Sequence, residues 1–280
     1  MKRIFVIGAN SALAKETIKV LSGNYEVITA GRKGCDVYCD IAKEVKIPKK
    51  VDVVINFAAA FGGTSDEEIT EAINTNVGGL LNVCMAAKAS NVKHVINISS
   101  VSALLDENSP YYSIYTLTKR QADEVATLYC TLNDIKLTVL RPTQIYGESD
   151  EFRKHQAFFY MVLDKAEKGE DIAVYGKHDA LRNYIHCSDI ANVIERVVKK
   201  DVTGTYLCSY PSNVSYSSIA KNAQKIFGKG GKFQFLKDKP DIPDNIFKYD
   251  SKLYDKIGYL PKISLIDGLK RIRDYKDSNR

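Results

Sequence analysis

Several features that mark other classes of protein are missing from this sequence. No apolar run reaches the roughly 18 residues that a membrane-spanning helix needs, and the first strand-like segment starts without a charged-then-apolar leader. The net charge of +6 is mild for 280 residues, and the basic residues are spread along the chain, which argues against a nucleic-acid surface. We therefore expect a cytoplasmic protein that binds neither membranes nor nucleic acid.

The spacing of a metal site is also missing. The six cysteines form no CxxC pair, and the four histidines are scattered. Several cysteines lie within apolar stretches, so we expect reduced, mostly buried thiols and no bound metal. The sequence contains no internal repeat, low-complexity tract or flexible linker.

The chain opens on the pattern of a dinucleotide-binding turn. Lys2–Ile7 is typical of a buried parallel strand, and Gly8 starts a turn of small residues before a helix expected at about Ala12–Leu21. Gly8 permits close approach of a pyrophosphate, which the N–H groups at the helix start would face. Ser11 and Ala14 replace the usual later glycines, so a plain strand-to-helix turn is the alternative. The predicted cofactor contacts are Gly8, Asn10, Ser11, Ala12 and Leu13.

The end of the second expected strand, Tyr25–Thr29, distinguishes between the nicotinamide cofactors. An acid at this point would bind the ribose 2'-hydroxyl of NAD, but Arg32 and Lys33 follow the strand instead. Two cations suit the 2'-phosphate of NADP, and a solvated basic turn is the alternative interpretation. We therefore favour NADP(H) as the cofactor and keep NAD(H) as the second candidate.

Two further strands are expected to border the cofactor. A short strand over Asp36–Asp40 places Asp40 and Ile41 where they would border the adenine. A fourth strand, Val51–Phe57, leads into small residues that let the backbone pass close to the cofactor. The predicted contacts from this segment are Phe57, Ala58 and Ala59.

Tyr115 and Lys119 form the most informative pair in the sequence. Residues four apart lie on one face of a helix, so we expect the ammonium to lower the phenol pKa from its usual ~10 toward neutrality. Ser100 follows a buried strand predicted at Val95–Ile98, where its hydroxyl can orient a carbonyl or alcohol beside the phenol for proton transfer. Taken alone, the pair is equally typical of a surface tyrosine and a solvated lysine.

Taken in order, these segments resemble the extended short-chain dehydrogenase/reductases, and among them the NAD-dependent epimerase/dehydratase family that acts on nucleotide sugars. The matching segments are the Gly8 turn, Asn56 to Ala59, Asn76 in a helix expected from near Asn74, Asn97 to Ser100, Tyr115 with Lys119, Leu140 to Gly147, and Arg182 to Ile190. Strand and helix alternation to about residue 145 predicts an α/β fold with a doubly wound parallel sheet, or Rossmann fold. The resemblance implies a cofactor domain at 1–145, completed by 183–210, and a smaller C-terminal substrate-binding lobe from 146–182 and 211–280.

The resemblance also implies roles for single residues. Tyr115 would be the general acid/base, Lys119 its electrostatic partner and a ligand of the nicotinamide ribose, and Ser100 the carbonyl-orienting donor, with Ser99 and Ser102 as competitors. Asn76 would support the active-site backbone or a water relay, and a buried structural asparagine is equally open. The further cofactor contacts implied are Asn76, Tyr115, Lys119, Pro142, Thr143 and Ile145, and the substrate contacts are Ser100, Ser102, Gln144 and Arg182, of which Arg182 would bind phosphates. For Thr143 and Ile145, simple loop packing is the alternative.

The expected reaction follows from departures from the family pattern. Dehydratases of the family follow the catalytic hydroxyl with an Asp-Glu pair, whereas Val101 and Ser102 follow Ser100 here. Family epimerases hold NAD and carry the acid that Arg32 and Lys33 replace. We therefore favour an enzyme for NADPH-dependent reduction of a nucleoside-diphosphate 4-keto(-6-deoxy) sugar. A nucleotide-sugar 4-epimerase with tightly bound NAD is the alternative, and a non-catalytic NAD(P)-binding regulator is a third. The family also implies a homodimer.

Overall fold

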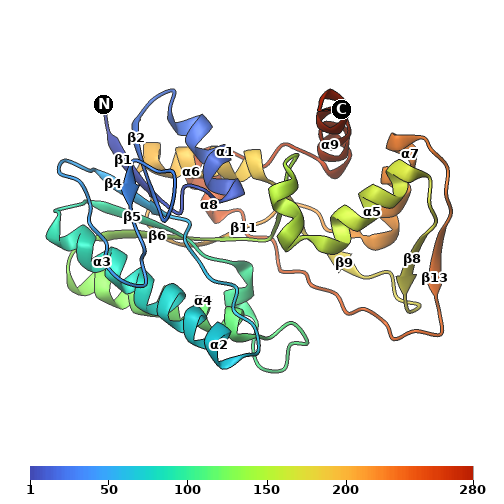
Figure 1. Ribbon diagram of the computed structural model, residues 1–280, viewed down its shortest axis with the longest axis horizontal. Coiled ribbons are helices and arrows are strands. Elements are labelled where there is room, and N and C mark those ends of the chain that lie inside the picture. The colour runs from blue at the N-terminus through green and yellow to red at the C-terminus, as the bar shows by residue number, and fades with distance from the viewer. Residues whose placement is uncertain (280) are drawn as a thin grey trace. The chain divides into compact units, whose positions relative to one another are not determined.

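The structure, a computed structural model, describes residues 1–279, which divide into two compact units (Figure 1). The first unit comprises Met1–Pro142, Ile190–Cys208 and Ser251–Tyr259, and the second comprises Thr143–Asp189, Ser209–Asp250 and the residues from Leu260 onward.

The boundaries of these units differ from the expected ones by two or three residues near 143 and 209, and by more at two further places. Residues 183–189 lie in the second unit, where β10 (Tyr184–His186) pairs with β7 (Gln144–Tyr146). Residues 251–259 lie in the first unit, because α8 (Lys252–Ile257) packs against β11 (Gly204–Cys208) through the buried side chains of Leu253, Tyr254 and Ile257.

The first unit is built on a seven-stranded parallel sheet, which confirms the predicted fold class. Its strands are β1 (Arg3–Ile7), β2 (Glu26–Gly31), β3 (Val37–Tyr38), β4 (Val53–Asn56), β5 (His94–Ile98), β6 (Lys136–Pro142) and β11. The spatial order is β11-β6-β5-β4-β1-β2-β3, so the direction of winding reverses between β1 and β4. In doubly wound sheets, ligands bind outside the carboxyl ends of the strands at this reversal.

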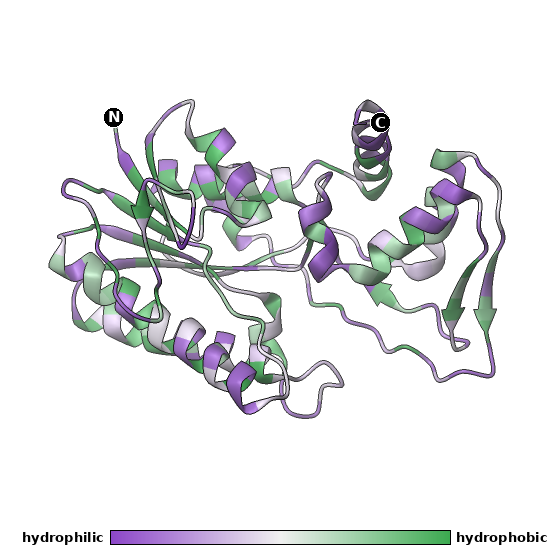
Figure 2. Ribbon diagram, viewed as in Figure 1, coloured by the Kyte–Doolittle hydropathy of each residue, from purple (hydrophilic) through white to green (hydrophobic). Residues whose placement is uncertain are grey.

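Helices cover both faces of this sheet. They are α1 (Ala12–Leu21), α2 (Asp66–Ala72), α3 (Gly79–Ala89), α4 (Ile114–Leu132), α6 (Cys187–Lys200) and α8. Helices α1, α6 and α8 lie on one face, and α3 and α4 lie on the other (Figure 1). Figure 2 shows hydrophobic and hydrophilic segments alternating along these helices, as expected for helices with one face on a core. No helix among residues 1–279 is both long and apolar enough to cross a membrane.

The second unit combines helices with three small sheets. Its elements are β7, η3 (Asp150–His155), α5 (Ala157–Lys168), β8 (Ile172–Tyr175), β9 (Leu181–Arg182), β10, β12 (Val214–Ser215), α7 (Tyr216–Phe227), β13 (Phe233–Leu236) and α9 (Leu265–Ser278). The strand pairs are β10-β7, β12-β9 and β13-β8. Helix α7 packs against both α5 and α9.

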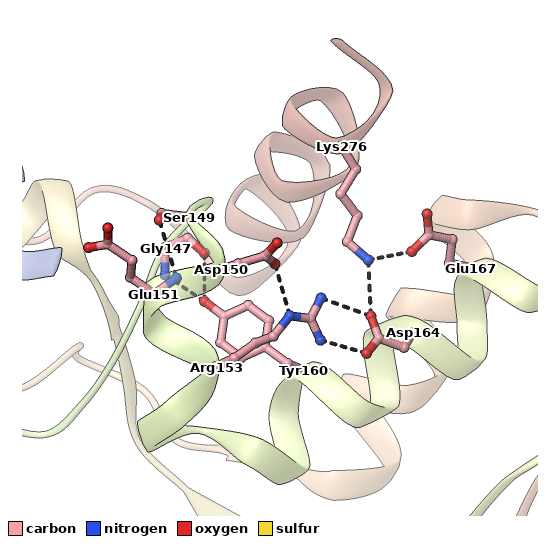
Figure 3. Close-up of polar contacts among 9 residues, drawn as sticks. All are labelled: Gly147, Ser149, Asp150, Glu151, Arg153, Tyr160, Asp164, Glu167 and Lys276. Carbon is pink, nitrogen blue, oxygen red and sulfur yellow. Dashed lines mark hydrogen bonds and ion pairs between the residues drawn. The ribbon is translucent and has the colours of Figure 1, made fainter. Parts of the chain in front are cut away.

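A network of charges fixes η3 and α9 to helix α5 (Figure 3). The Arg153 guanidinium donates to both oxygens of Asp164, at 2.5 and 3.0 Å, and Lys276 donates to Asp164 at 3.1 Å and to Glu167. Tyr160 adds a neutral link, because its hydroxyl donates to the Gly147 carbonyl at 2.6 Å and accepts from the Gly147 N–H at 3.2 Å. Bidentate arginine–carboxylate pairs add geometric specificity, so this network defines how η3 sits on α5.

One expected strand ends elsewhere, and one helix was not expected. The second strand continues to Gly31, two residues beyond its predicted end. Asn76 lies in η1 (Ile73–Gly78), which begins within one residue of the predicted Asn74, but helix α2 precedes η1 without a break and begins at Asp66. Ser65 and Glu68 form a capping box there, in which the serine side chain accepts from the Glu68 N–H and the glutamate side chain accepts from the Ser65 N–H.

Candidate active site

The N-terminal turn of α4 presents Tyr115 toward the end of β5. Ser113 caps this helix in a reciprocal box with Thr116, which places Tyr115 in the first turn. Ser100, two residues beyond β5, caps the short helix η2 (Val101–Leu104), and its side chain is near enough to the Tyr115 phenol to lower its pKa. The structure therefore brings together the serine and tyrosine predicted from the sequence.

A phenylalanine that no sequence pattern had marked covers the Tyr115 ring. Phe61 lies in the loop after β4, and its ring stacks on that of Tyr115 with centroids 4.7 Å apart and an interplanar angle of 14°. Phe61 remains 49% exposed. One face of the Tyr115 phenol is therefore screened from water by a ring that is itself open to solvent on its outer side.

Lys119 lies one turn beyond Tyr115 and is almost fully buried. Its Nζ donates to the Ile98 carbonyl at 3.0 Å and lies 5.9 Å from the centre of the Tyr115 ring. Burial lowers the pKa of Lys119 to about 8, and the nearby Asp123 carboxylate opposes this fall. Lys119 is thus close enough to act on the phenol, as the four-residue spacing predicted.

The predicted shift of the phenol pKa has the wrong sign. Burial raises the pKa of Tyr115 to about 12, although the Ser100 side chain opposes the rise. The expected fall toward neutrality assumed that the Lys119 charge outweighs desolvation, and here desolvation is larger. Tyr115 therefore carries its proton at neutral pH and can act as an acid.

The three candidate serines occupy different positions. The Ser99 hydroxyl donates to Asp123 at 2.8 Å in a buried position. The Ser100 hydroxyl accepts from the Ser102 N–H at 3.1 Å. Of the three, Ser100 is the serine near enough to the phenol to lower its pKa, whereas the Ser99 hydroxyl is bonded to Asp123.

Asn76 joins two elements beside the site. It lies in η1 (Ile73–Gly78), a π-helical turn between α2 and α3, and is buried. Its Oδ1 accepts from the Ala60 N–H at 2.9 Å, and its Nδ2 donates to the Ala60 carbonyl at 2.8 Å and to the Thr118 hydroxyl at 2.9 Å. The Asn76 amide group donates both of its hydrogen bonds to other protein atoms, which favours support of the backbone over a water relay.

The turn after β1 has the geometry of a dinucleotide site. Gly8 adopts a φ of +74°, and a Cβ atom built on it would lie 2.7 Å from the Ala58 nitrogen in the loop after β4. Ser11 caps α1, accepting from the Ala14 N–H at 3.3 Å. The Asn10 amide donates to the Lys33 carbonyl at 2.6 Å and so ties this turn to the next loop; a contact of Asn10 with the cofactor stays a prediction.

The loop after β2 exposes the two predicted cations. Arg32 and Lys33 directly follow Gly31 and are both exposed. The nearby acid, Asp36, is engaged within the loop, because one carboxylate oxygen accepts from both the N–H and the hydroxyl of Thr29, at 2.8 and 2.7 Å. The positive charges therefore dominate the end of this strand.

The remaining predicted cofactor contacts of the first unit follow the same edge of the sheet. Asp40 is partly buried and Ile41 is buried against Gly79, where an added Cβ would lie 2.8 Å from the isoleucine. After β4, Phe57 is buried, Ala58 is half-buried and Ala59 is exposed. Together with the Gly8 turn and the exposed cations, these positions fit a dinucleotide along the carboxyl ends of β1 to β4.

The other predicted contacts divide between the units, and Arg182 is buried. Pro142 ends β6 in the first unit, whereas Thr143, Gln144, Ile145 and Arg182 belong to the second. Arg182 is 3% exposed, donates to the Leu181 and Pro243 carbonyls at 2.8 and 2.9 Å, and lies 4.7 Å over the Tyr216 ring. Thr143 donates to the Asn183 side chain at 2.9 Å, which fits its loop-packing alternative. Phosphate binding by Arg182 stays a prediction.

The second unit also brings together Glu148, His186 and Cys187, with potential ligand atoms within 4.8 Å of one another. The His186 Nδ1 accepts from the Ser188 N–H at 3.2 Å, and its Nε2 lies 3.4 Å from the Glu148 carboxylate. These three side chains could hold a metal ion, and sequence spacing had not suggested the cluster.

Two charged residues behind the site were missed by the sequence analysis. Asp123 lies four residues after Lys119 on α4, and Arg141 lies on β6 with its Nε 2.8 Å from the Asp123 carboxylate. The four-residue step from Lys119 was a usable signal, because it places Asp123 on the same helix face. Nothing in the sequence pattern linked Arg141 to it.

Comparison with known proteins agrees with this geometry. Residues 4–208 match the NAD dependent epimerase/dehydratase family. A protein of Methanocaldococcus jannaschii, provisionally named a UDP-glucose 4-epimerase, is 25% identical, and the match covers 99% of each chain. The trifunctional UDP-glucose 4,6-dehydratase/UDP-4-keto-6-deoxy-D-glucose 3,5-epimerase/UDP-4-keto-L-rhamnose-reductase RHM2 of Arabidopsis thaliana is 23% identical over 86% of this chain and 38% of its own length.

A similar solved structure is that of UDP-glucuronic acid 4-epimerase from Bacillus cereus in complex with UDP-glucuronic acid and NAD. Its TM-score is 0.79 at 20% identity, over 99% of this chain and all of the other. At this identity the likeness shows the fold, and the family match over residues 4–208 shows the ancestry. The chain is an enzyme of the NAD-dependent epimerase/dehydratase family.

Proposed function

We propose that this enzyme reduces the 4-keto group of a nucleoside-diphosphate 4-keto(-6-deoxy) sugar with NADPH. The observation that carries this proposal is the convergence of Ser100, Tyr115 and Lys119, in which Tyr115 holds its proton at neutral pH. Reduction of a carbonyl needs a proton donor, whereas oxidation of an alcohol, the first step of epimerisation, needs a base. A phenol that burial keeps protonated at neutral pH can supply that proton.

In this proposal each residue has a separate task. NAD(P)H, when bound, supplies the hydride that goes to the carbonyl carbon. Tyr115 donates its phenolic proton to the carbonyl oxygen, which becomes the new hydroxyl. Ser100, near enough to the phenol to lower its pKa, orients the same oxygen. Lys119, 5.9 Å from the phenol ring, stabilises the phenolate that remains.

The preference for NADPH is supported by the loop after β2. Arg32 and Lys33 are exposed at the position where an acid would select NAD, and Asp36 is held by Thr29. Guanidinium and ammonium groups bind phosphate through charge-assisted hydrogen bonds. The RHM2 relative, whose name includes a reductase activity, supports reduction within the family.

A 4-epimerase with tightly bound NAD is the second candidate. The relative provisionally named a UDP-glucose 4-epimerase matches 99% of both chains. An epimerase also uses Ser100, Tyr115 and Lys119, but Tyr115 would first accept a proton. Bound nucleotide distinguishes the two candidates, because an epimerase regenerates its cofactor in each cycle and has no need to release it.

The first experiment identifies the cofactor. Freshly purified protein is denatured and any released nucleotide is identified, and the empty protein is then titrated with NADPH and NADH. We expect empty protein that prefers NADPH. Arg32→Ala should weaken NADPH binding roughly 10- to 100-fold, the equivalent of one lost charge-assisted hydrogen bond, with little effect on NADH. Lys88→Ala, an exposed lysine on α3, is the matched control.

The second experiment tests the reaction. Oxidation of NADPH is followed with a 4-keto-6-deoxy sugar nucleotide, and the product is identified as the 4-hydroxy sugar. Stoichiometric bound NAD together with interconversion of 4-epimers would instead establish the epimerase. Nucleotide binding with neither reaction, across several sugar nucleotides, would favour a non-catalytic regulator.

We also propose that the enzyme forms a homodimer through α3 and α4. Met85 on α3 is 50% exposed, and Leu128 and Leu132 on α4 are 63% and 73% exposed. Leu128 and Leu132 are four residues apart and share one helix face. Sedimentation analysis should show a dimer that Leu128→Asp dissociates, whereas a wild-type monomer at micromolar concentration would contradict it.

A further inference from the structure

A buried carboxylate lies directly behind the proton-transfer groups. Asp123 on α4 is 2% exposed. One of its oxygens accepts from the Ser99 hydroxyl and from the Arg141 Nε, each at 2.8 Å, and the other lies 3.5 Å from the Asn97 amide. A buried charge persists when it is paired and hydrogen-bonded, and Asp123 meets both conditions.

Asp123 lies where it can supply a counter-charge to the buried Lys119 ammonium. The two residues are one helical turn apart on α4, and Lys119 is 3% exposed. The recorded hydrogen bond of the Lys119 ammonium is to the uncharged Ile98 carbonyl. An ammonium taken out of water needs a counter-charge to stay protonated, and Asp123 is the anion whose attraction opposes the effect of burial on Lys119.

Asp123 also reaches the serine side of the site. The Ser99 hydroxyl donates a hydrogen bond to Asp123, and Ser99 is the residue before Ser100. The same carboxylate therefore constrains the turn that presents Ser100 to Tyr115. Asn97 on β5 continues the network to Asn56 on β4, whose amide donates to it at 3.0 Å. These bonds connect α4 to β4, β5 and β6 beneath the site.

We propose that Asp123 is a positioning residue for the proton-transfer site. Its buried carboxylate keeps the Lys119 ammonium charged and, through Ser99, holds Ser100 against Tyr115. This inference rests on the function proposed for Tyr115 and Lys119 and adds the group that sets their charge. Asp123 itself touches neither the phenol nor any reacting atom.

The charges around Lys119 fix the direction of the expected effects. On α4 they are Lys119 and Asp123, with the Tyr115 phenol as the third titratable group, and β6 contributes Arg141. The neighbouring strands β4 and β5 contribute the uncharged side chains of Asn56, Asn97 and Ser99. Two cations and one anion leave one net positive charge, which a Tyr115 phenolate would neutralise.

The test uses two variants of the same ion pair: one removes its anion, Asp123, and the other removes its cation, Arg141. Asp123→Asn removes the anion and should lower the titration midpoint of Lys119 by roughly one pH unit or more. Arg141→Gln removes a cation that competes for Asp123, and should raise the midpoint. The midpoint is followed by NMR on protein with 13C at the lysine Cε, and the Lys119 signal is the one absent from Lys119→Arg.

This readout needs neither cofactor nor substrate, so it is independent of the proposed reaction. A purely structural ion pair would destabilise both variants and leave the Lys119 midpoint unmoved, or move it in the same direction in both, and either result would overturn the proposal. Opposite shifts would support it even in a protein that proved to lack reductase activity, in which case the proposed function alone would be rejected.

Two further variants keep the test interpretable. Asp123→Glu retains the charge and should preserve the Lys119 titration midpoint to within a few tenths of a pH unit. This variant remains informative if Asp123→Asn folds poorly. Glu124→Gln removes an exposed carboxylate from the adjacent position on α4 and should leave the midpoint unchanged. A shift in Glu124→Gln as large as that in Asp123→Asn would show a general charge effect and would contradict the specific role of Asp123.

Discussion

The ring of Phe61 lies parallel to that of Tyr115 and covers one face of the phenol, with centroids 4.7 Å apart. Burial is the main cause of the raised pKa of Tyr115, and Phe61 supplies part of that burial from a loop on a different strand. The protonation state of the proposed acid is therefore coupled to the conformation of the loop after β4.

Phe61→Ala should bring the pKa of Tyr115 down from about 12 toward its usual ~10. Removing the ring admits water, which stabilises the phenolate. At pH 10.5 the variant should show more tyrosinate absorbance than the wild type, and the excess should disappear when Tyr115→Phe is added. Met85→Ala, which also truncates a half-exposed apolar side chain and adds no phenol, serves as the control. Equal absorbance in the variant and the wild type would show that Phe61 does not shield the phenol.

Tyr115→Phe should reduce turnover by about 10²- to 10⁴-fold, the usual contribution of a positioned general acid. The affinity for the nicotinamide cofactor should change little, because the ring and its stacking on Phe61 remain. Steady-state rates and cofactor titrations measure the two effects separately. Tyr112→Phe, three residues earlier and outside the proposed machinery, should retain activity. Full activity in Tyr115→Phe would disprove the mechanism.

Gly8→Ala should destabilise the protein by about 1–3 kcal/mol and abolish dinucleotide binding. The loss of stability has two causes: the φ of +74° at this position, which L-residues rarely adopt, and the added Cβ atom, which would lie 2.7 Å from the Ala58 nitrogen. Gly23→Ala is a matched control, since no atom lies within 4 Å of its added Cβ. Urea unfolding and nucleotide titration measure both effects, and similar results for the two variants would refute the assigned geometry.

The stability of the fold should fall as the pH drops from about 6.5 to about 4, because of His94. This histidine is 1% exposed at the start of β5, and burial lowers its pKa to about 4, with Asp201 opposing the shift. In the unfolded chain the imidazole takes up a proton near pH 6.5, so acid favours unfolding in this window. The loss should reach at most about 3 kcal/mol.

Urea unfolding at a series of pH values checks this dependence. His94→Gln should be less stable at pH 7, because its bond to the Thr138 hydroxyl, 2.7 Å long in the wild type, is changed. Its stability should, however, vary less between pH 6.5 and 4. An unchanged slope in this variant would assign the acid sensitivity to other groups.

The sequence predicted the alternating elements of the first unit because their signals are local. Apolar runs marked the central strands, and the predicted bounds of α1 match the observed ones. The start of α2 was also encoded locally, in Ser65 and Glu68 with acids between them, but the apolar pattern of this helix is weak. Capping residues were the better guide there than periodicity.

The features of the site that could not be predicted from the sequence are contacts between residues far apart in the chain. Phe61 and Tyr115 meet across 54 positions of sequence, and the burial that results reverses the expected pKa shift. The choice between Ser99 and Ser100 also required the fold, because it depends on which hydroxyl faces Asp123. Arg182 carries a family motif, yet its guanidinium is enclosed by backbone carbonyls and Tyr216.

The π-helical turn that holds Asn76 makes the length of this helix as important as its composition. Helices α2 and α3 run on through η1 from Asp66 to Ala89, and each residue of an α-helix advances it by about 100°. A deletion within the α-helical part of α3 would therefore rotate the residues after it by about that angle and turn Val83, Cys84 and Ala87 out of the core they now occupy. The π turn η1 bonds residue i to i+5 and so holds one residue more than an α turn. Loss of one residue from η1 should convert it to an α turn and keep the buried face of α3 in place, so along this continuous helix the tolerance of a deletion depends on which turn loses the residue.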